Sequence, residues 1–203
     1  MTISRFNPNR SFMLSMHPNI LSILFNHKNE ILKKLSDLRG LHYIDHVSLI
    51  LITPQREIIV LSITPSVEFN LIIQDLWQYD MSFNPIHFTT DKLLFWDTAY
   101  LEDHQIQLKF VKEIQHGFAF GFNLIRKIHD FHLIYSFATR KDELELRNYY
   151  QSIVPDLYSL GDYGYKQLRE IFEHYTANSL PPCAVPNQIS PMHNRLRLVV
   201  NNK

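Results

Sequence analysis

Two clusters of side chains have the residue types that bind metal ions. They are His42, Asp45 and His46, and His129, Asp130 and His132. On a strand, the two histidines of the first cluster would share a face, and three such donors could form a site with an open position. No HExxH pattern and no paired Cys/His spacing accompanies either cluster. The sequence therefore favours exposed histidines at strand ends and in a hairpin turn, and it predicts neither a metal nor another cofactor.

Nucleophilic catalysis is not indicated either. Ser48 and Ser136 lie in expected strands, and neither is part of a G-x-S-x-G elbow. The pair Glu102-Asp103 resembles the start of a helix, where negative charge is favourable. Cys183 is the only cysteine, which excludes an intramolecular disulfide, and no neighbour would stabilise its thiolate. We predict that the protein is not an enzyme.

One irregular stretch combines aromatic faces with a few directional polar groups. Its members are Trp77, Tyr79, Asp80, Phe83, Asn84, Phe95 and Trp96. This mixture is typical of the wall of a ligand pocket, and binding residues concentrate on irregular segments that a rigid scaffold carries. The alternative is a surface loop that its aromatic side chains pin to a sheet.

The elements that must position these side chains follow from hydrophobic periodicity. Helical spacing predicts helices over 15–38, 67–79 and 98–115, the last with Ile106, Phe110, Val111 and Ile114 on one face, and two more helices from Asp142 to about Tyr175 with a turn at 161–164. β-prone runs predict one hairpin from strands 46–52 and 57–64, and a second that turns near His129-Asp130 and returns over 131–139. Residues 80–96 are expected to be irregular.

Hairpins rather than alternating βα units predict an α/β (α+β) protein. We expect a three-layer α–β–α sandwich around a mainly antiparallel sheet, with helices on both faces. The 203 residues suit one domain. We divide the chain into an N-terminal extension (1–14), a sensor-like ligand-binding domain (15–176) and a proline-rich C-terminal tail (177–203).

Composition restricts the partners. Twenty basic residues balance twenty acidic ones, so we expect no binding to nucleic acid by this chain alone. The N-terminus lacks the apolar core of a signal peptide, and no stretch approaches the eighteen or so apolar residues of a membrane span. We expect a cytoplasmic protein with no membrane partner, although export by a specialised secretion system would need no such signal. An aromatic content of 13% fits a lined pocket, a protein interface or a Phe-rich core.

Residues 116–140 carry the strongest family signal. The run GFAFG over 117–121 resembles the step from a helix into the central strand in the autoinducer-binding domain of LuxR-type quorum-sensing regulators. The run YSFAT over 135–139 resembles a later sheet strand of the same domain. The resemblance extends over roughly 15–176 and implies a PAS- or GAF-like sandwich that encloses a ligand cavity.

The resemblance also implies a set of ligand-binding residues. They are Phe69, Ile73, Trp77, Tyr79, Asn84, Trp96, Tyr135 and Phe137. Trp96 resembles the tryptophan that donates a hydrogen bond to a lactone carbonyl. Asn84 stands where the family has an aspartate that accepts a hydrogen bond from an acyl-amide N–H. Phe69 and Ile73 replace a tryptophan–tyrosine pair, and Phe137 falls near the family's partner for a ligand hydroxyl.

We therefore expect a non-enzymatic sensing or regulatory module for a small apolar or acyl ligand. Nothing after Tyr175 can form the family's helix-turn-helix, so the module would act by pairing with itself or with related regulators. The alternative is a secreted bacterial effector or protein-interaction module that uses the same scaffold to bind a host or partner protein. A sensor predicts an enclosed cavity above about 300 Å³, whereas an effector predicts a solid core and an exposed apolar patch.

Overall fold

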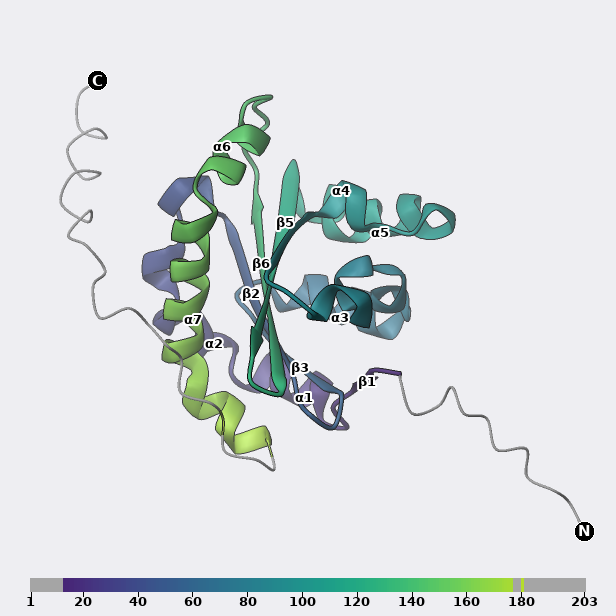
Figure 1. Ribbon diagram of the computed structural model, residues 1–203, viewed down its shortest axis with the longest axis vertical. Coiled ribbons are helices and arrows are strands. Elements are labelled where there is room, and N and C mark those ends of the chain that lie inside the picture. The colour runs from purple at the N-terminus through teal and green to yellow at the C-terminus, as the bar shows by residue number, and fades with distance from the viewer. Residues whose placement is uncertain (1–12, 177–179, 181–203) are drawn as a thin grey trace, which may run out of the picture.

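A six-stranded sheet lies between two layers of helices (Figure 1). The computed structural model describes residues 13–176 and Leu180, and the prediction of an extension over 1–14 and a tail over 177–203 falls almost wholly outside them. The strand order is β1-β3-β2-β6-β5-β4, and every pair is antiparallel except β1 with β3. The strands are β1 (Ser15–Met16), β2 (His46–Ile52), β3 (Glu57–Ser62), β4 (Lys92–Phe95), β5 (Phe120–Ile128) and β6 (Phe131–Thr139). The predicted three-layer architecture is confirmed.

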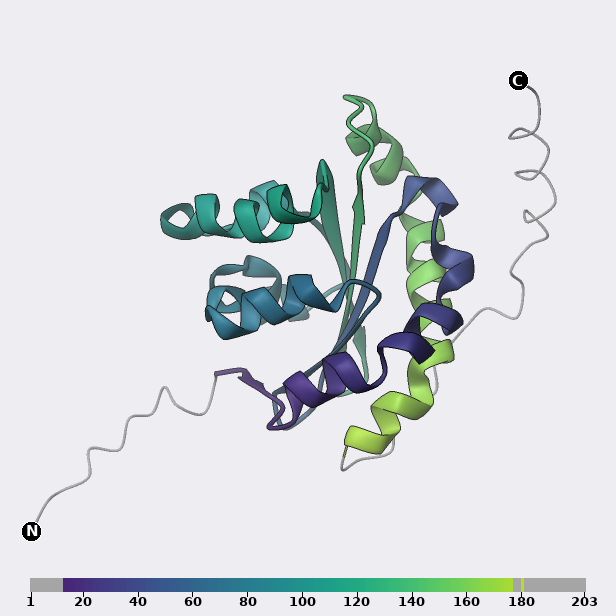
Figure 2. The same ribbon diagram turned by 180° about the vertical axis from the view of Figure 1, so that it is seen from behind.

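The two faces of the sheet have different covers, as the two opposite views show (Figures 1 and 2). One face packs against the long helix α7 (Val154–Tyr175), with α2 (Lys28–Lys34) and α6 (Leu146–Ser152) beside it. The other face packs against α3 (Pro65–Ile73), α4 (Trp96–Ala99) and α5 (Gln105–Lys112). Helix α1 (Ile20–Asn26) runs along β3. Short 3₁₀ turns complete the connections: η2 (Ser36–Leu38), η3 (Leu41–Tyr43), η4 (Leu76–Tyr79), η5 (Met81–Phe83), η6 (Pro85–Phe88), η7 (Glu102–His104) and η8 (Ile114–His116).

The central strands form because most of their residues on both faces are apolar and β-prone. All seven residues of β2 are buried, and β6 is buried at eight of its nine positions. Strands that are covered on both sides show such continuous burial instead of a simple alternation. The hairpin β5–β6 turns at His129, whose φ of 54° is left-handed, so both predicted hairpins are confirmed.

A buried polar group ties α7 to the sheet. The Tyr135 hydroxyl donates to Asp162 Oδ1 at 2.6 Å, and Arg126 pairs with the other oxygen of the same carboxylate. Gly161 allows this approach, since a Cβ there would lie 2.0 Å from the Tyr135 ring. The turn predicted at 161–164 is therefore wrong: this glycine stands inside α7 because the helix backbone lies directly on an aromatic ring.

The helices predicted over 15–38, 67–79 and 98–115 and from Asp142 are also longer in the prediction than in the structure. The region 15–38 contains β1, α1, α2 and η2, and the helix predicted over 67–79 stops at Ile73, before a left-handed Asp75. The region 98–115 is divided among α4, η7, α5 and η8, and β4 lies within the stretch expected to be irregular. The helix expected from Asp142 begins at Leu146. These breaks arise from tertiary packing, which overrides local propensity.

The four apolar residues predicted to share one face of the helix over 98–115 are divided, because only Val111 is buried. Leu108, Val111 and the stem of Lys112 point inward and are buried. Three apolar residues are exposed instead, Ile106 (85%) and Phe110 (53%) on α5 and Ile114 (62%) at the start of η8. We call these three residues the α5 stripe. No helix in the described part of the chain is long and apolar enough to cross a membrane.

Candidate functional site

A row of polar side chains crosses the sheet face that α3 and α5 cover. Ser48 on β2 pairs in register with Ser62 on β3 and with Ser136 on β6, which in turn pairs with Asn123 on β5. All four are buried, although the flanking positions on this face are aliphatic. Since buried polar groups must find hydrogen-bond partners, such a row is costly for packing alone and indicates a site.

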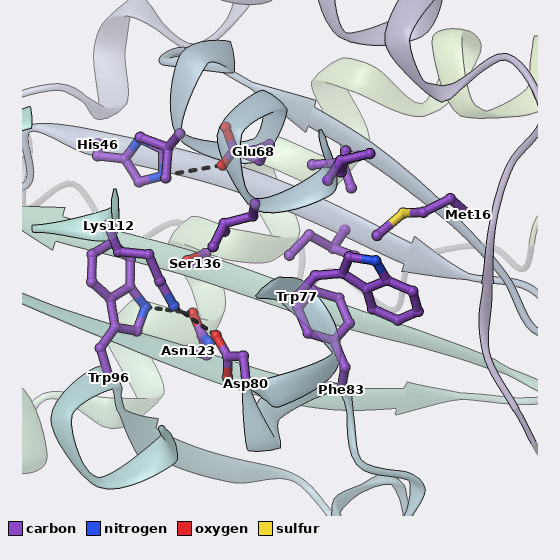
Figure 3. A pocket seen from close by; sticks show the side chains of 15 residues that line it. Met16, His46, Glu68, Trp77, Asp80, Phe83, Trp96, Lys112, Asn123 and Ser136 are labelled. Atoms are coloured by element: carbon purple, nitrogen blue, oxygen red, sulfur yellow. Dashed lines mark hydrogen bonds and ion pairs between the residues drawn. The ribbon is translucent and has the colours of Figure 1, made fainter. Parts of the chain in front are cut away.

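A cavity of about 30 Å³ lies between this row and the covering helices. Its walls come from β1, β2, β3, β5, β6, α3, η4, η5, α4 and α5. Polar side chains gather on one side of the cavity, whereas Met16, Trp77 and Phe83 form an apolar side (Figure 3). The volume suits about one water molecule, so among the described residues this cavity is far smaller than the enclosed cavity above about 300 Å³ that was expected of a sensor.

An ion pair is buried in the cavity wall. Lys112 Nζ donates to Asp80 Oδ2 at 2.7 Å, and both residues are less than 4% exposed. The other oxygen of Asp80 accepts from the backbone N–H of Ser82 at 2.9 Å. The Lys112 ammonium also lies 4.0 Å from the centre of the Trp96 ring, where the aromatic face attracts a cation. A ligand that approaches Asp80 therefore meets a carboxylate whose charge is already compensated.

Trp96 is held in one orientation by its polar and steric contacts. Its indole N–H donates to Asn123 Oδ1 at 3.0 Å, and Asn123 donates to Ser82 Oγ at 2.6 Å. The ring lies flat against β5 at Gly121, where a Cβ would come within 2.3 Å of the indole. Because Gly121 has no side chain, the Trp96 ring can occupy this position at the cavity.

A second acidic and basic pair faces the cavity next to Trp96. His46 Nε2 lies 3.5 Å from Glu68 Oε1, and the two side chains are fully or almost fully buried. Burial alone would raise the pKa of Glu68, but the pairing with His46 and a contact with Ser62 outweigh it and hold this pKa below the usual range. The carboxylate is thereby kept ionised in an apolar setting.

Another buried carboxylate lies close to these groups without lining the cavity. Glu113 Oε1 accepts a hydrogen bond from the Tyr100 hydroxyl at 2.9 Å. Burial raises the pKa of Glu113. Glu113 can therefore be compared with Asp80 and Glu68, which are buried carboxylates that line the cavity.

Of the residues that the family resemblance implied, two line the cavity: Trp77 and Trp96. The positions of the other six are as follows: Phe69 packs on Phe25, Ile73 is 52% exposed, Tyr79 stacks on His104, Asn84 caps η6, and Tyr135 and Phe137 face α7. The structure does not bring these six to the cavity. Ligand binding by the eight residues remains a prediction.

Asn84, the residue that the resemblance implied for the aspartate position, does not line the cavity, whereas Asp80 does. Asn84 Oδ1 accepts from the backbone N–H of Ile86, so its amide shapes a turn. Asp80 instead presents a buried carboxylate next to Trp96 in the cavity wall. Asp80 was recognised as part of the aromatic and polar stretch, but its depth could not be read from the loop sequence.

Other residues at the cavity were missed because the strands are buried on both faces. His46, Asn123 and Ser136 line the cavity, and Ser48 is buried in the same row. Polar residues in phase on paired, largely apolar strands are the signal that could have found them. The metal hypothesis gains no support, since no group of three metal-ligating side chains occurs among residues 13–176 and Leu180.

The fold is that of an autoinducer-binding domain of a LuxR-type quorum-sensing regulator. The solved structure of SdiA in complex with octanoyl-rac-glycerol matches 74% of this chain and 63% of the SdiA chain, with 14% identity and a TM-score of 0.54. A crystal structure of Escherichia coli SdiA matches 74% of this chain and 62% of its own, with 16% identity and a TM-score of 0.50. The chain thus spans less than two thirds of the length of SdiA. No family model and no curated protein matches the sequence.

Proposed function

We propose that this protein is a non-enzymatic sensor module that binds a small amphiphilic molecule, with an acyl or similar apolar tail, in the cavity beneath α3. The observation that carries the proposal is the division of the cavity into a polar and an apolar side (Figure 3). The fold shared with SdiA, whose solved complex contains octanoyl-rac-glycerol, supports the same ligand class.

Binding would require the cover of the cavity to move. A volume of about 30 Å³ cannot hold an acyl chain, so α3 and η4 would have to shift outward from the sheet. Leu71 on α3 and Trp77 on η4 both line the cavity, and a left-handed residue, Asp75, separates the two elements. Such a displacement would convert ligand binding into a change of surface shape, which is what a sensor module transmits.

The experiment that tests the proposal is calorimetric titration with octanoylglycerol. We expect one molecule bound per chain and an increase in the melting temperature, because a ligand that binds only the folded state stabilises it. Leu71→Trp should fill the cavity and abolish binding. Ile73→Trp, on the exposed side of the same helix, is the matched control and should bind normally. Absence of binding to octanoylglycerol and to other octanoyl amphiphiles would exclude this function.

Pairing with a second copy or with a related regulator, in the cytoplasm, belongs to the same proposal. The exposed α5 stripe supports a paired state, and a protein-interaction module would require the same kind of surface. Light scattering during size-exclusion chromatography should show a dimer for the native chain and a monomer for Phe110→Glu. A native chain that stays monomeric with and without octanoylglycerol would refute self-pairing.

A further inference from the structure

The polar side of the cavity has two ends. At one end the polar groups have hydrogen-bond partners, and at the other end they do not. Around Asp80, the carboxylate oxygens, the Lys112 ammonium and the Trp96 N–H each have a hydrogen-bond partner. At the other end, both ring nitrogens of His46 and Glu68 Oε2 are buried without a hydrogen-bond partner in the described part of the chain. We call His46 and Glu68 the unsatisfied pair.

The unsatisfied pair is built into the site and is not a surface accident. His46 is 0% and Glu68 6% exposed, and both line the cavity. Nε2 and Oε1 lie 3.5 Å apart, at ion-pair distance but without the geometry of a hydrogen bond, and among the described residues Nδ1 and Oε2 have no hydrogen-bond partner. Ser48 Oγ, two residues along β2, is also buried and unpartnered. Each such buried atom costs on the order of 1–3 kcal/mol, so a chain that keeps His46 and Glu68 together in the cavity wall, with Ser48 behind it, indicates a missing ligand group.

Few chemical groups can satisfy a histidine and a carboxylate at once. A carbonyl oxygen accepts from the imidazole but leaves the carboxylate without a donor. A ligand carboxylate would be repelled by Glu68, and an ammonium group could donate to Glu68 but could not accept from His46. A hydroxyl does both, because its oxygen accepts from an imidazole N–H while its hydrogen is donated to the carboxylate.

We propose that His46 and Glu68 form a hydroxyl-binding subsite that selects ligands with an alcohol in the head group, such as monoacylated polyols, over acyl lactones without a hydroxyl. The inference rests on the proposed function, since the hydroxyl belongs to the amphiphile in the cavity. The ionised Glu68 described above strengthens the contact, because hydrogen bonds to charged groups are stronger than those between neutral groups.

Three probes with the same tail test the subsite: 1-octanoylglycerol, its 2,3-dimethyl ether and N-octanoyl homoserine lactone. The native chain should bind octanoylglycerol about tenfold or more tightly than the other two, which corresponds to one hydrogen bond to a charged group. Glu68→Gln should weaken octanoylglycerol about tenfold and change the affinity for the ether and the lactone by less than about twofold. Glu113→Gln, a neutralised buried carboxylate that does not line the cavity, should retain the preference of the native chain.

The outcomes separate the subsite from the proposed function. Equal affinity for the three probes, or a preference for octanoylglycerol that survives Glu68→Gln, would overturn the subsite and leave the sensor function intact. Failure of all three to bind would overturn both.

The subsite can also be tested on the native chain, so that the result does not depend on whether Glu68→Gln folds. The ¹⁵N and ¹H resonances of the His46 imidazole should shift on addition of octanoylglycerol and much less with the dimethyl ether at equal occupancy. Identical shifts with the two compounds would contradict a hydroxyl at His46.

Discussion

The two faces of the central sheet differ in whether their buried polar groups have hydrogen-bond partners. On the face toward α7, the polar groups of Tyr135, Asp162 and Arg126 are joined to one another within an apolar core. On the face toward α3, His46 and Glu68 are buried with unpartnered polar atoms at a cavity. The first face therefore joins its buried polar groups to one another, whereas the second leaves buried polar atoms without partners, as the proposed hydroxyl subsite requires.

Both faces are made from the same strands, residue by residue. On β6, Tyr135 and Phe137 pack toward α7, while Ser136 between them lines the cavity. Since successive side chains on a strand point to opposite faces, neighbouring residues can have unrelated roles. Substitutions on the two faces should accordingly separate stability from ligand affinity.

The largest effect is expected on the face toward α7. Phe137 is fully buried and contacts the Phe122 ring, so Phe137→Ala should lower the free energy of unfolding by about 3–5 kcal/mol, as urea denaturation would measure. The affinity of the folded fraction for octanoylglycerol should stay within about twofold of the native value, because the side chain points away from the cavity. The milder variant Phe137→Leu should retain most of the stability. If it nevertheless lost affinity for octanoylglycerol, Phe137 would be part of the binding site.

Two glycines allow the same perturbation to be made on each face. A Cβ would lie 2.3 Å from the Trp96 ring at Gly121 and 2.0 Å from the Tyr135 ring at Gly161. Overpacking of this kind costs about 1–3 kcal/mol, so calorimetric melting should show both alanine variants destabilised. We expect octanoylglycerol binding to be lost only in Gly121→Ala, since only that change displaces a cavity residue. Equal loss of binding in both variants would mean that the faces are not independent.

The sequence predicted the fold more completely than the site, for physical reasons. The two hairpins were predictable because their strands are continuous β-prone runs with turn residues between them. The ends of the helices were not, since packing against the sheet decides where 15–38 and 98–115 break. Local pattern also grouped Val111 with residues that are exposed, because the buried Lys112 takes an inward position that a periodicity argument assigns to solvent.

The site was harder to predict because it depends on strand register. Tyr135 and Phe137 were predicted for the site, but only Ser136, which lies between them, lines the cavity. Because almost all of β6 is buried, the sequence does not reveal which alternate residues face α7 and which face α3. Asn84 was predicted for the site, whereas Asp80, in the same loop of short turns, is the residue whose side chain lines the cavity. That distinction is a tertiary property with no local signal.

The smallest effect should come from Ser48, and it tests whether the face toward α3 carries polar atoms that cost stability. Ser48 Oγ is buried without a partner, so Ser48→Ala removes an unsatisfied polar atom and should leave the free energy of unfolding unchanged or raise it by up to about 1 kcal/mol. Ser62→Ala is the matched control on the adjacent strand, because Ser62 Oγ accepts from the backbone N–H of Thr64 and its loss should cost about 1 kcal/mol. Urea denaturation of the two variants gives the comparison. Equal destabilisation would show that Ser48 is satisfied in solution, for example by a buried water. A gain at Ser48 would instead show that the polar row is kept at the expense of stability, as expected if its purpose is to bind a ligand.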